Sequence, residues 1–271
     1  MVNNNRNVIR ILTLALAVSL AIVSFSGVFV PSTYERDAAS MAAQGVGQDI
    51  VNLFIVLPLL VLTLIFMLKD RKAATYIYGG TLFYVLYSFV IYSFGVHFNR
   101  LFLLYCITLG LSFFAFVILM YDLSRMDVQD WVVHSILSRS IGIFLIIISV
   151  MFYLLWLKDI IPAILTNTVP QTISDYNLLV NPVHVIDIAI ALPGLLLTAI
   201  LLIKKHRLGY ILAPISLVFI IILAIALIGM VLALQARDIT DDISIAGIFV
   251  VLAIISIILL FFFLRNTKNG M

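Results

Sequence analysis

Long apolar runs alternate with short polar connections along nearly the whole chain. Each run is about twenty residues long, which is enough for a helix to cross the ~30 Å hydrocarbon core of a bilayer. The pattern predicts eight transmembrane helices, over Ile9–Val30, Ile50–Leu68, Ala73–Val96, Leu101–Tyr121, Ser140–Ile161, Pro182–Ile203, Gly209–Leu234 and Ile243–Leu264. We therefore expect an all-α polytopic membrane protein.

The sixth run has the clearest boundaries. Asn181 is a helix-capping residue, and Pro182 follows it at the first helical position, where a missing N–H costs nothing. The basic cluster 204–207 ends the run. Inside it lies Asp187, the only acidic residue within an apolar run; Asp159 follows Lys158 at the end of the fifth run. Ionisable groups inside spans usually mark a functional path, because burying one costs at least ~2.5 kcal/mol at mid-helix. Asp49, by contrast, is expected at the surface start of the second span.

The distribution of basic residues predicts the orientation of the chain. Cytoplasmic connections of membrane proteins carry an excess of Lys and Arg. Placing the N-terminus in the cytoplasm leaves twelve of the sixteen Lys and Arg residues inside, and only Arg36, Arg100, Lys158 and Arg237 outside. Most acidic residues fall on the outer side. We therefore expect a protein of the cell membrane with both termini cytoplasmic.

Composition supports a membrane protein and excludes several other classes. Of the 271 residues, 64% are hydrophobic and only 11% are charged, whereas a soluble domain carries about 25% charged residues. The net charge of +3 comes from short loops beside apolar runs, so the expected partner is the lipid bilayer and not nucleic acid. A single cysteine, Cys106, excludes an intramolecular disulfide and a cysteine-based zinc cluster.

The longer connections differ in character. The segment 31–49 is rich in small and polar residues and is expected to lie over the outer face, and so is the segment 162–181, whose apolar piece 163–165 is expected in the interface. The inner segment 122–139 carries apolar residues at helical spacing opposite polar ones. That pattern predicts an amphipathic helix in the headgroup plane.

The second half of the chain resembles the first at an offset of 135 residues. Leucine and isoleucine matches mean little in such a chain, but the polar and proline matches stay in register: Asn52 with Asp187, Pro58 with Pro193, Thr63 with Thr198, and Lys69 with Lys204. The sequence therefore predicts two tandem, same-orientation four-helix repeats, 1–121 and 140–271, joined by the linker 122–139. Such parallel repeats, related by an axis along the membrane normal, occur in some transporters.

Several polar residues fall near the outer ends of the predicted spans. The fifth span ends with Lys158 and Asp159, and the sixth begins with His184 and Asp187, which lie three residues apart and so share a helix face. We expect them to converge on a water-accessible pocket in which Lys158 pairs with Asp187; a purely structural pair is the alternative. Two further candidates are His97, at the outer end of the third span, and Asn52, the counterpart of Asp187 in the first repeat.

Other candidate chemistry is sparse. A metal site built from His97, His184 and Asp187 lacks any His-x-x-x-His or His-Glu-x-x-His spacing, so no metal site is predicted. In the third span Tyr84, Tyr87 and Ser88 share a face at helical spacing. They either line a cavity or hydrogen-bond to neighbouring helices, and the second alternative is favoured.

Three segments carry a resemblance to a known group. WLxDxxP at 156–162, NPVHVxD at 181–187 and LP at 192–193 resemble a family of prokaryotic multi-pass membrane proteins to which no activity is assigned. The resemblance implies that these positions act as a unit.

Three functions are compatible with these features. A transporter or channel-like protein for a small solute or ion is favoured by the parallel repeats and the outward-facing polar pocket. The alternatives are an outward-facing membrane enzyme or metal-handling protein using His184 and Asp187, and a non-catalytic membrane subunit. A transporter requires polar residues in the inner half, where the sequence offers little beyond Thr63, Ser88 and Thr198. No catalytic motif or cofactor-binding motif is present in the sequence.

Overall fold

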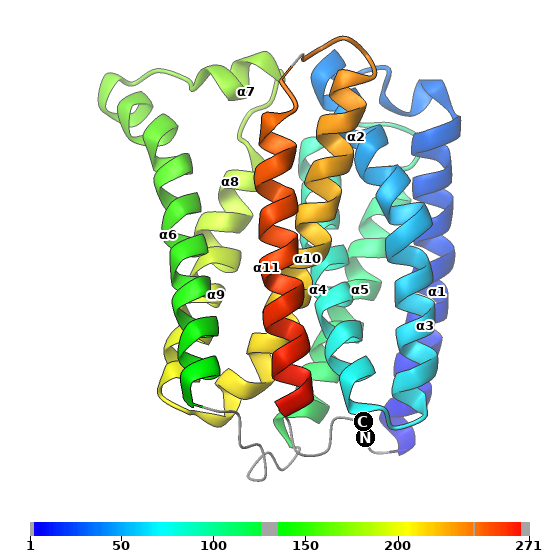
Figure 1. The fold of residues 1–271 in the computed structure, drawn as a ribbon. Coiled ribbons are helices and arrows are strands. Elements are labelled where there is room, and N and C mark those ends of the chain that lie inside the picture. The colour runs from blue at the N-terminus through cyan, green and yellow to red at the C-terminus, as the bar shows by residue number, and fades with distance from the viewer. Residues whose placement is uncertain (1–2, 126–134, 241, 267–271) are drawn as a thin grey trace.

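The computed structural model describes residues 3–125, 135–240 and 242–266, and within them the regular structure is entirely helical. Figure 1 shows the helices as one elongated bundle. The elements in chain order are α1 (Asn3–Phe29), η1 (Pro31–Tyr34), α2 (Ala39–Val51), η2 (Asn52–Val56), α3 (Leu57–Leu68), α4 (Lys72–Gly95), α5 (Phe102–Ser124), α6 (Ser135–Thr166), α7 (Gln171–Asp175), α8 (Pro182–Ile186), η3 (Asp187–Ala191), α9 (Leu192–Ile203), α10 (Arg207–Gln235) and α11 (Ser244–Asn266).

Eight helices in the described part of the chain are long and apolar enough to cross a membrane. The predicted number of spans is therefore confirmed. Two of the spans are composite: α2, η2 and α3 form one continuous helix from Ala39 to Leu68, and α8, η3 and α9 form another from Pro182 to Ile203.

The second span begins well before the predicted Ile50, and this overturns the expected outer connection 31–49. Only η1 and the residues up to Ala38 connect α1 to α2. The misreading has a physical cause, because residues 39–48 are mostly small and weakly hydrophobic. Small residues here permit close helix packing, as in many membrane bundles. At Gly47 an added Cβ would lie 2.3 Å from the carbonyl oxygen of Gly229 in α10.

The fifth span is also longer than predicted. α6 runs from Ser135 to Thr166 with Pro162 inside it, so the piece 163–165, expected in the interface, belongs to its last turns. Half of the predicted amphipathic linker 122–139, residues 126–134, lies outside the described residues. Of its ends, 122–124 finish α5 and 135–139 begin α6.

The two composite spans contain a π-helical turn at corresponding positions. η2 covers Asn52–Val56 and η3 covers Asp187–Ala191, and each is followed by a Leu-Pro pair that opens the next α-helix. Proline has no N–H and its ring clashes with the carbonyl one turn back, so it disturbs the helix upstream of itself. A widened turn accommodates the disturbance, and such turns often occur at functional sites.

Helices α4 and α10 form the centre of the bundle. α4 packs on α3 and α5, whereas α10 packs on α9 and α11, and the two central helices also pack on each other. α10 contacts α2 as well, and α8 contacts α4, so residues far apart in sequence meet along this seam. At Gly80 an added Cβ would lie 2.4 Å from Cβ of Val218, which shows how closely the central helices approach.

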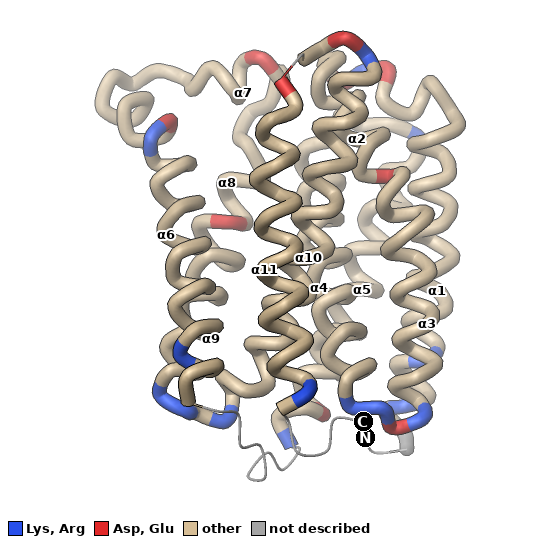
Figure 2. Tube along the Cα trace, viewed as in Figure 1, with Lys and Arg blue, Asp and Glu red and all other residues tan. Residues whose placement is uncertain are grey.

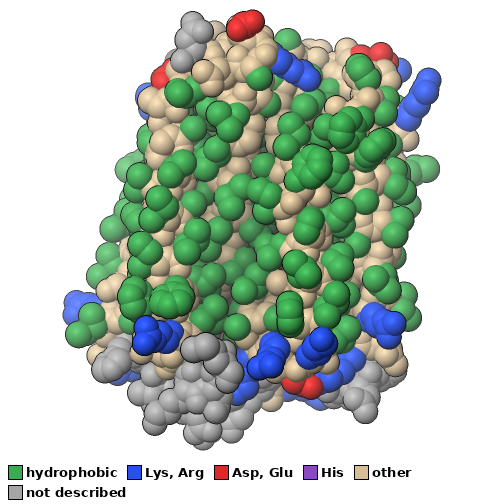
Figure 3. All heavy atoms as spheres, turned by 45° about the vertical axis from the view of Figure 1, so that its right-hand side comes forward, with side chains coloured by type: hydrophobic (Ala, Val, Ile, Leu, Met, Phe, Trp, Pro, Cys, Tyr) green, Lys and Arg blue, Asp and Glu red, His purple; other side chains and the backbone are tan. Residues whose placement is uncertain are grey.

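Charged residues separate to the two ends of the bundle. α1 begins and α11 ends at the same end, where most Lys and Arg residues gather, and acidic residues predominate at the other end (Figure 2). We call these the basic end and the acidic end. Between them the surface in Figure 3 is largely covered by hydrophobic side chains, as expected for contact with lipid tails.

The close approach of α2 to α10 generates the first prediction. Replacing Gly47 with alanine should push the two helices apart, since the new Cβ meets backbone and no flexible side chain. Overpacking of this kind costs ~1–3 kcal/mol, so the thermal midpoint of the purified protein should fall by several degrees. Gly110→Ala is the matched control, because nothing lies within 4 Å of an added Cβ there. Equal midpoints for the two variants would contradict this account of the interface.

Candidate functional site

A cavity of about 270 Å³ lies between the two halves of the chain at the acidic end. We call it the acidic-end cavity. Its wall combines residues of the η1–α2 region with residues of α4, α6, α8 and α10, and with Tyr176 after α7. Asp37, Asp159 and His184 are its titratable residues other than tyrosines, and five aromatic side chains complete much of the wall: Tyr34, Tyr87, Tyr92, Trp156 and Tyr176.

Asp187 is held by two aromatic donors from different helices. It is the first residue of η3, and only 6% of it is exposed. The Tyr87 hydroxyl of α4 donates to Oδ1 at 2.9 Å, and the Trp156 indole N–H of α6 donates to Oδ2 at 2.8 Å. No ion pair joins Asp187 to Lys158, so the expected cationic partner is replaced by two neutral donors.

Asp49 is a second buried carboxylate, which the sequence interpretation missed. It was expected at a surface helix start, but it lies inside the composite second span and is fully buried. The Tyr34 hydroxyl donates to Oδ2, and the Tyr92 hydroxyl donates to Oδ1 at 2.9 Å. A Cβ at Gly27 would lie 1.7 Å from Oδ2, so α1 can pass this carboxylate closely only because position 27 is glycine.

Asn52 occupies the first position of η2, as Asp187 does in η3. Its Oδ1 accepts a hydrogen bond of 3.0 Å from the Tyr84 hydroxyl, while its Nδ2 is buried without a hydrogen-bond partner. Hydrogen bonding of Tyr84 and Tyr87 to neighbouring helices is thereby confirmed, and Tyr87 also lines the acidic-end cavity, so both alternatives hold for it. Tyr92 extends the pattern. Three tyrosines of α4 thus donate hydrogen bonds to three buried polar residues in the two composite spans.

The remaining predicted site residues occupy different environments. His184 is buried, with its ring centre 4.7 Å from that of Trp156 and its Nε2 3.4 Å from Nδ2 of Asn181. Asp159 is exposed and lines the cavity. Lys158 is exposed and does not line it.

His97 lies just outside the cavity wall. Its Nδ1 and its backbone N–H both lie 2.9 Å from Oδ1 of Asp37, which does line the cavity. The structure therefore groups His184, Asp187 and Asp159 around Trp156, and leaves Lys158, His97 and Asn52 apart from that group.

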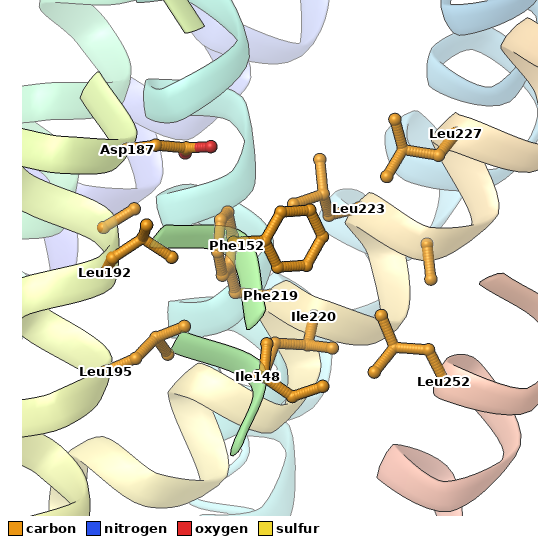
Figure 4. Close-up of a pocket in the computed structure, with 12 residues that line it drawn as sticks. Ile148, Phe152, Asp187, Leu192, Leu195, Phe219, Ile220, Leu223, Leu227 and Leu252 are labelled. Carbon is orange, nitrogen blue, oxygen red and sulfur yellow. The ribbon is translucent and has the colours of Figure 1, made fainter. Parts of the chain in front are cut away.

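A small apolar cavity of about 30 Å³ lies on the other side of Asp187. Figure 4 shows the carboxylate above Leu192 and Phe152 and facing toward α10. Leu223 and Leu227 of α10 line both this cavity and the acidic-end cavity. Asp187 therefore sits between a polar compartment and an apolar one.

The donor set does not assemble a metal centre within the described residues. No three His, Cys, Asp or Glu side chains there come together closely enough to hold an ion. The buried carboxylates instead accept hydrogen bonds from O–H and N–H donors, which stabilise a negative charge.

The eight apolar helices, together with a hydrophobic surface between two charged ends, are compatible with a multi-pass integral membrane protein. Comparison with models of known protein families, with curated proteins and with solved structures finds no match for this chain.

The buried environment of Asp49 generates a stability prediction. Asp49→Ala leaves the Tyr34 and Tyr92 hydroxyls buried without an acceptor, and each unsatisfied group costs ~1–3 kcal/mol. The thermal midpoint should therefore fall far more than in Glu35→Ala, which removes an exposed carboxylate at the same end. A Glu35→Ala protein as unstable as Asp49→Ala would show that the tyrosine pair contributes little.

Proposed function

We propose that this chain is a transporter or channel-like protein for a small solute or ion, and that the acidic-end cavity is its outward-facing binding pocket. The observation that carries the proposal is the position of Asp187. It begins a π-helical turn in a composite span, and its two hydrogen-bond donors, Tyr87 and Trp156, line the cavity. Transporters commonly build ligand sites from interrupted helices at the interface between two halves.

Several features support two tandem, same-orientation repeats, 1–121 and 140–271. The π-helical turns η2 and η3 begin 135 residues apart, and a Leu-Pro pair follows each. Consecutive spans pack on each other in the same order in both halves, with α4 and α10 in equivalent central places. Such repeats would allow one half to rock against the other along the α4–α10 seam.

The electrostatics of the buried carboxylates also favour a transport role. A carboxylate buried without a cationic partner is costly to ionise, and such residues within spans usually mark substrate or ion paths. Asp49 and Asp187 both meet this description, because their hydrogen-bond partners are neutral. Nothing comparable favours catalysis, since His184 and Asp187 share no hydrogen bond in the described structure.

Transport through the cavity can be tested with two tryptophan substitutions on α8. Proteoliposomes on a solid-supported membrane are challenged with small solutes and ions one at a time, and at least one should give a current above that of empty liposomes. Val183→Trp should abolish it by filling the cavity that Val183 lines. Val185→Trp should retain it, because Val185 is exposed and lies outside this cavity. A current equally insensitive to both substitutions would overturn the assignment of the pocket.

The proposed orientation places the acidic end outside the cell and both termini in the cytoplasm. In a Cys106→Ala background, a membrane-impermeant thiol reagent added to intact cells should label Thr168→Cys, which is exposed at the acidic end. It should label Ser124→Cys, at the end of α5, only after the cells are permeabilised. The reverse pattern would invert the topology.

A further inference from the structure

The wall of the acidic-end cavity carries two carboxylates, and the basic groups beside them are imidazoles: His184 lines the wall, and His97 contacts Asp37. Asp37 and Asp159 line the cavity, and among the described residues neither a Lys nor an Arg does. The nearest basic residues in sequence, Arg36 and Lys158, are exposed and absent from the wall. A cavity lined by one sign of charge and set in low-dielectric surroundings concentrates ligands of the opposite sign.

Two further carboxylates lie one side chain behind the wall. Tyr34 and Tyr92 stand between the cavity and Asp49, and Tyr87 and Trp156 stand between it and Asp187. One wall carboxylate also keeps an unmatched oxygen, since Oδ2 of Asp37 is buried without a hydrogen-bond partner. Where Asp49 and Asp187 are ionised, they add to the negative field of the lining residues.

The aromatic residues of the wall offer few hydrogen-bond donors to an anionic ligand. A tyrosine or tryptophan side chain has a single N–H or O–H to donate. Four of the five aromatic residues donate theirs to Asp49 or Asp187, and so none of these four is left for a bound anion. What such residues still offer a ligand is the face of an aromatic ring, which attracts a cation by ~0.5–2 kcal/mol.

The cavity also has a size and a chemistry that favour an organic cation over a metal ion. Its volume of about 270 Å³ is just below the roughly 300–1,000 Å³ of typical small-molecule sites. A bare metal ion would require several converging oxygen or nitrogen ligands, and no such group of three His, Cys, Asp or Glu residues exists in the described chain. An ammonium group needs only a negative field and aromatic faces.

We propose that the acidic-end cavity binds a small organic cation of the substituted-ammonium class. This inference rests on the proposed function in using the same pocket, and it specifies the charge and chemical class of the ligand. The Asp37 and Asp159 carboxylates neutralise the ligand charge, and the aromatic side chains between them and the buried carboxylates surround its alkyl groups.

Binding can be measured without transport by using Trp156 as a reporter. The chain has two tryptophans, so Trp131→Phe leaves Trp156 alone in the cavity wall. Choline is the probe, 3,3-dimethylbutan-1-ol is its uncharged isostere, and propionate is the anionic comparison. Choline should change the fluorescence saturably, while the isostere should bind about tenfold more weakly, equivalent to a difference of ~1.4 kcal/mol.

Matched charge variants make the measurement specific to the cavity. Asp159→Asn should weaken choline binding several-fold, because it removes a carboxylate from the wall. Asp238→Asn removes an exposed carboxylate at the same end but outside the wall, and should leave binding unchanged. Asparagine also tolerates the positive φ of 55° at position 238.

The possible results separate this inference from the proposed function. Equal binding of choline and its isostere, preferential binding of propionate, or no saturable response to choline up to millimolar concentrations would each overturn the cation assignment. Selective choline binding in a protein that gives no solute current would support the inference while contradicting transport. A current sensitive to Val183→Trp but carried by an anion would do the opposite.

Discussion

The hydrogen bonds from the tyrosines of α4 to the two composite spans are the interactions on which the rest of the structure depends. A helix can be interrupted inside the membrane only where other protein groups form hydrogen bonds with the backbone and side-chain groups that the interruption leaves unpaired. Tyr84, Tyr87 and Tyr92 supply donors to Asn52, Asp187 and Asp49 respectively. One helix therefore holds the polar residues at both π-helical turns in place.

This arrangement requires α4 to lie at the centre of the bundle, and glycine makes that possible. The absence of a side chain at Gly80 lets α10 approach the backbone of α4. Gly47 likewise lets α10 approach the backbone of α2. Close contact of this kind gains van der Waals energy, which drives helix association where lipid already surrounds the apolar surface. From this central position the tyrosines of α4 reach hydrogen-bond acceptors in both composite spans.

The sequence predicted those features that hydrophobicity determines and missed those that depend on how the helices pack. The number of spans followed from run length and composition, because lipid imposes both. The start of the second span was placed too late, since residues 39–48 are small and resemble a loop. That error concealed Asp49, which looked like a surface helix start. Reading the small residues as a packing face opposite a tyrosine-rich span would have revealed it.

The candidate site was only partly predictable for a related reason. Asp187 and His184 stood out because lipid makes polar residues rare in spans, and the 135-residue offset pointed to Asn52. The partner of Asp187 was chosen by charge and nearness in sequence, which favoured Lys158. In the structure Lys158 is exposed, in keeping with the tendency of long basic side chains to extend their charge toward water. Two uncharged donors take its place, Tyr87 of α4 and Trp156, which lies on α6 two residues before Lys158.

The same position in the two composite spans is bonded in two different ways, and the difference bears on mechanism. Tyr84 and Asn52 belong to the same half of the chain, and so do Asp49, Tyr34 and Tyr92. These bonds would survive a rigid movement of one half against the other. The bond between Tyr87 and Asp187 crosses from one half to the other, so any movement that separates α4 from η3 must break it. In the proposed transporter, opening the seam between the halves would therefore cost this hydrogen bond, whereas the bonds within the first half would remain.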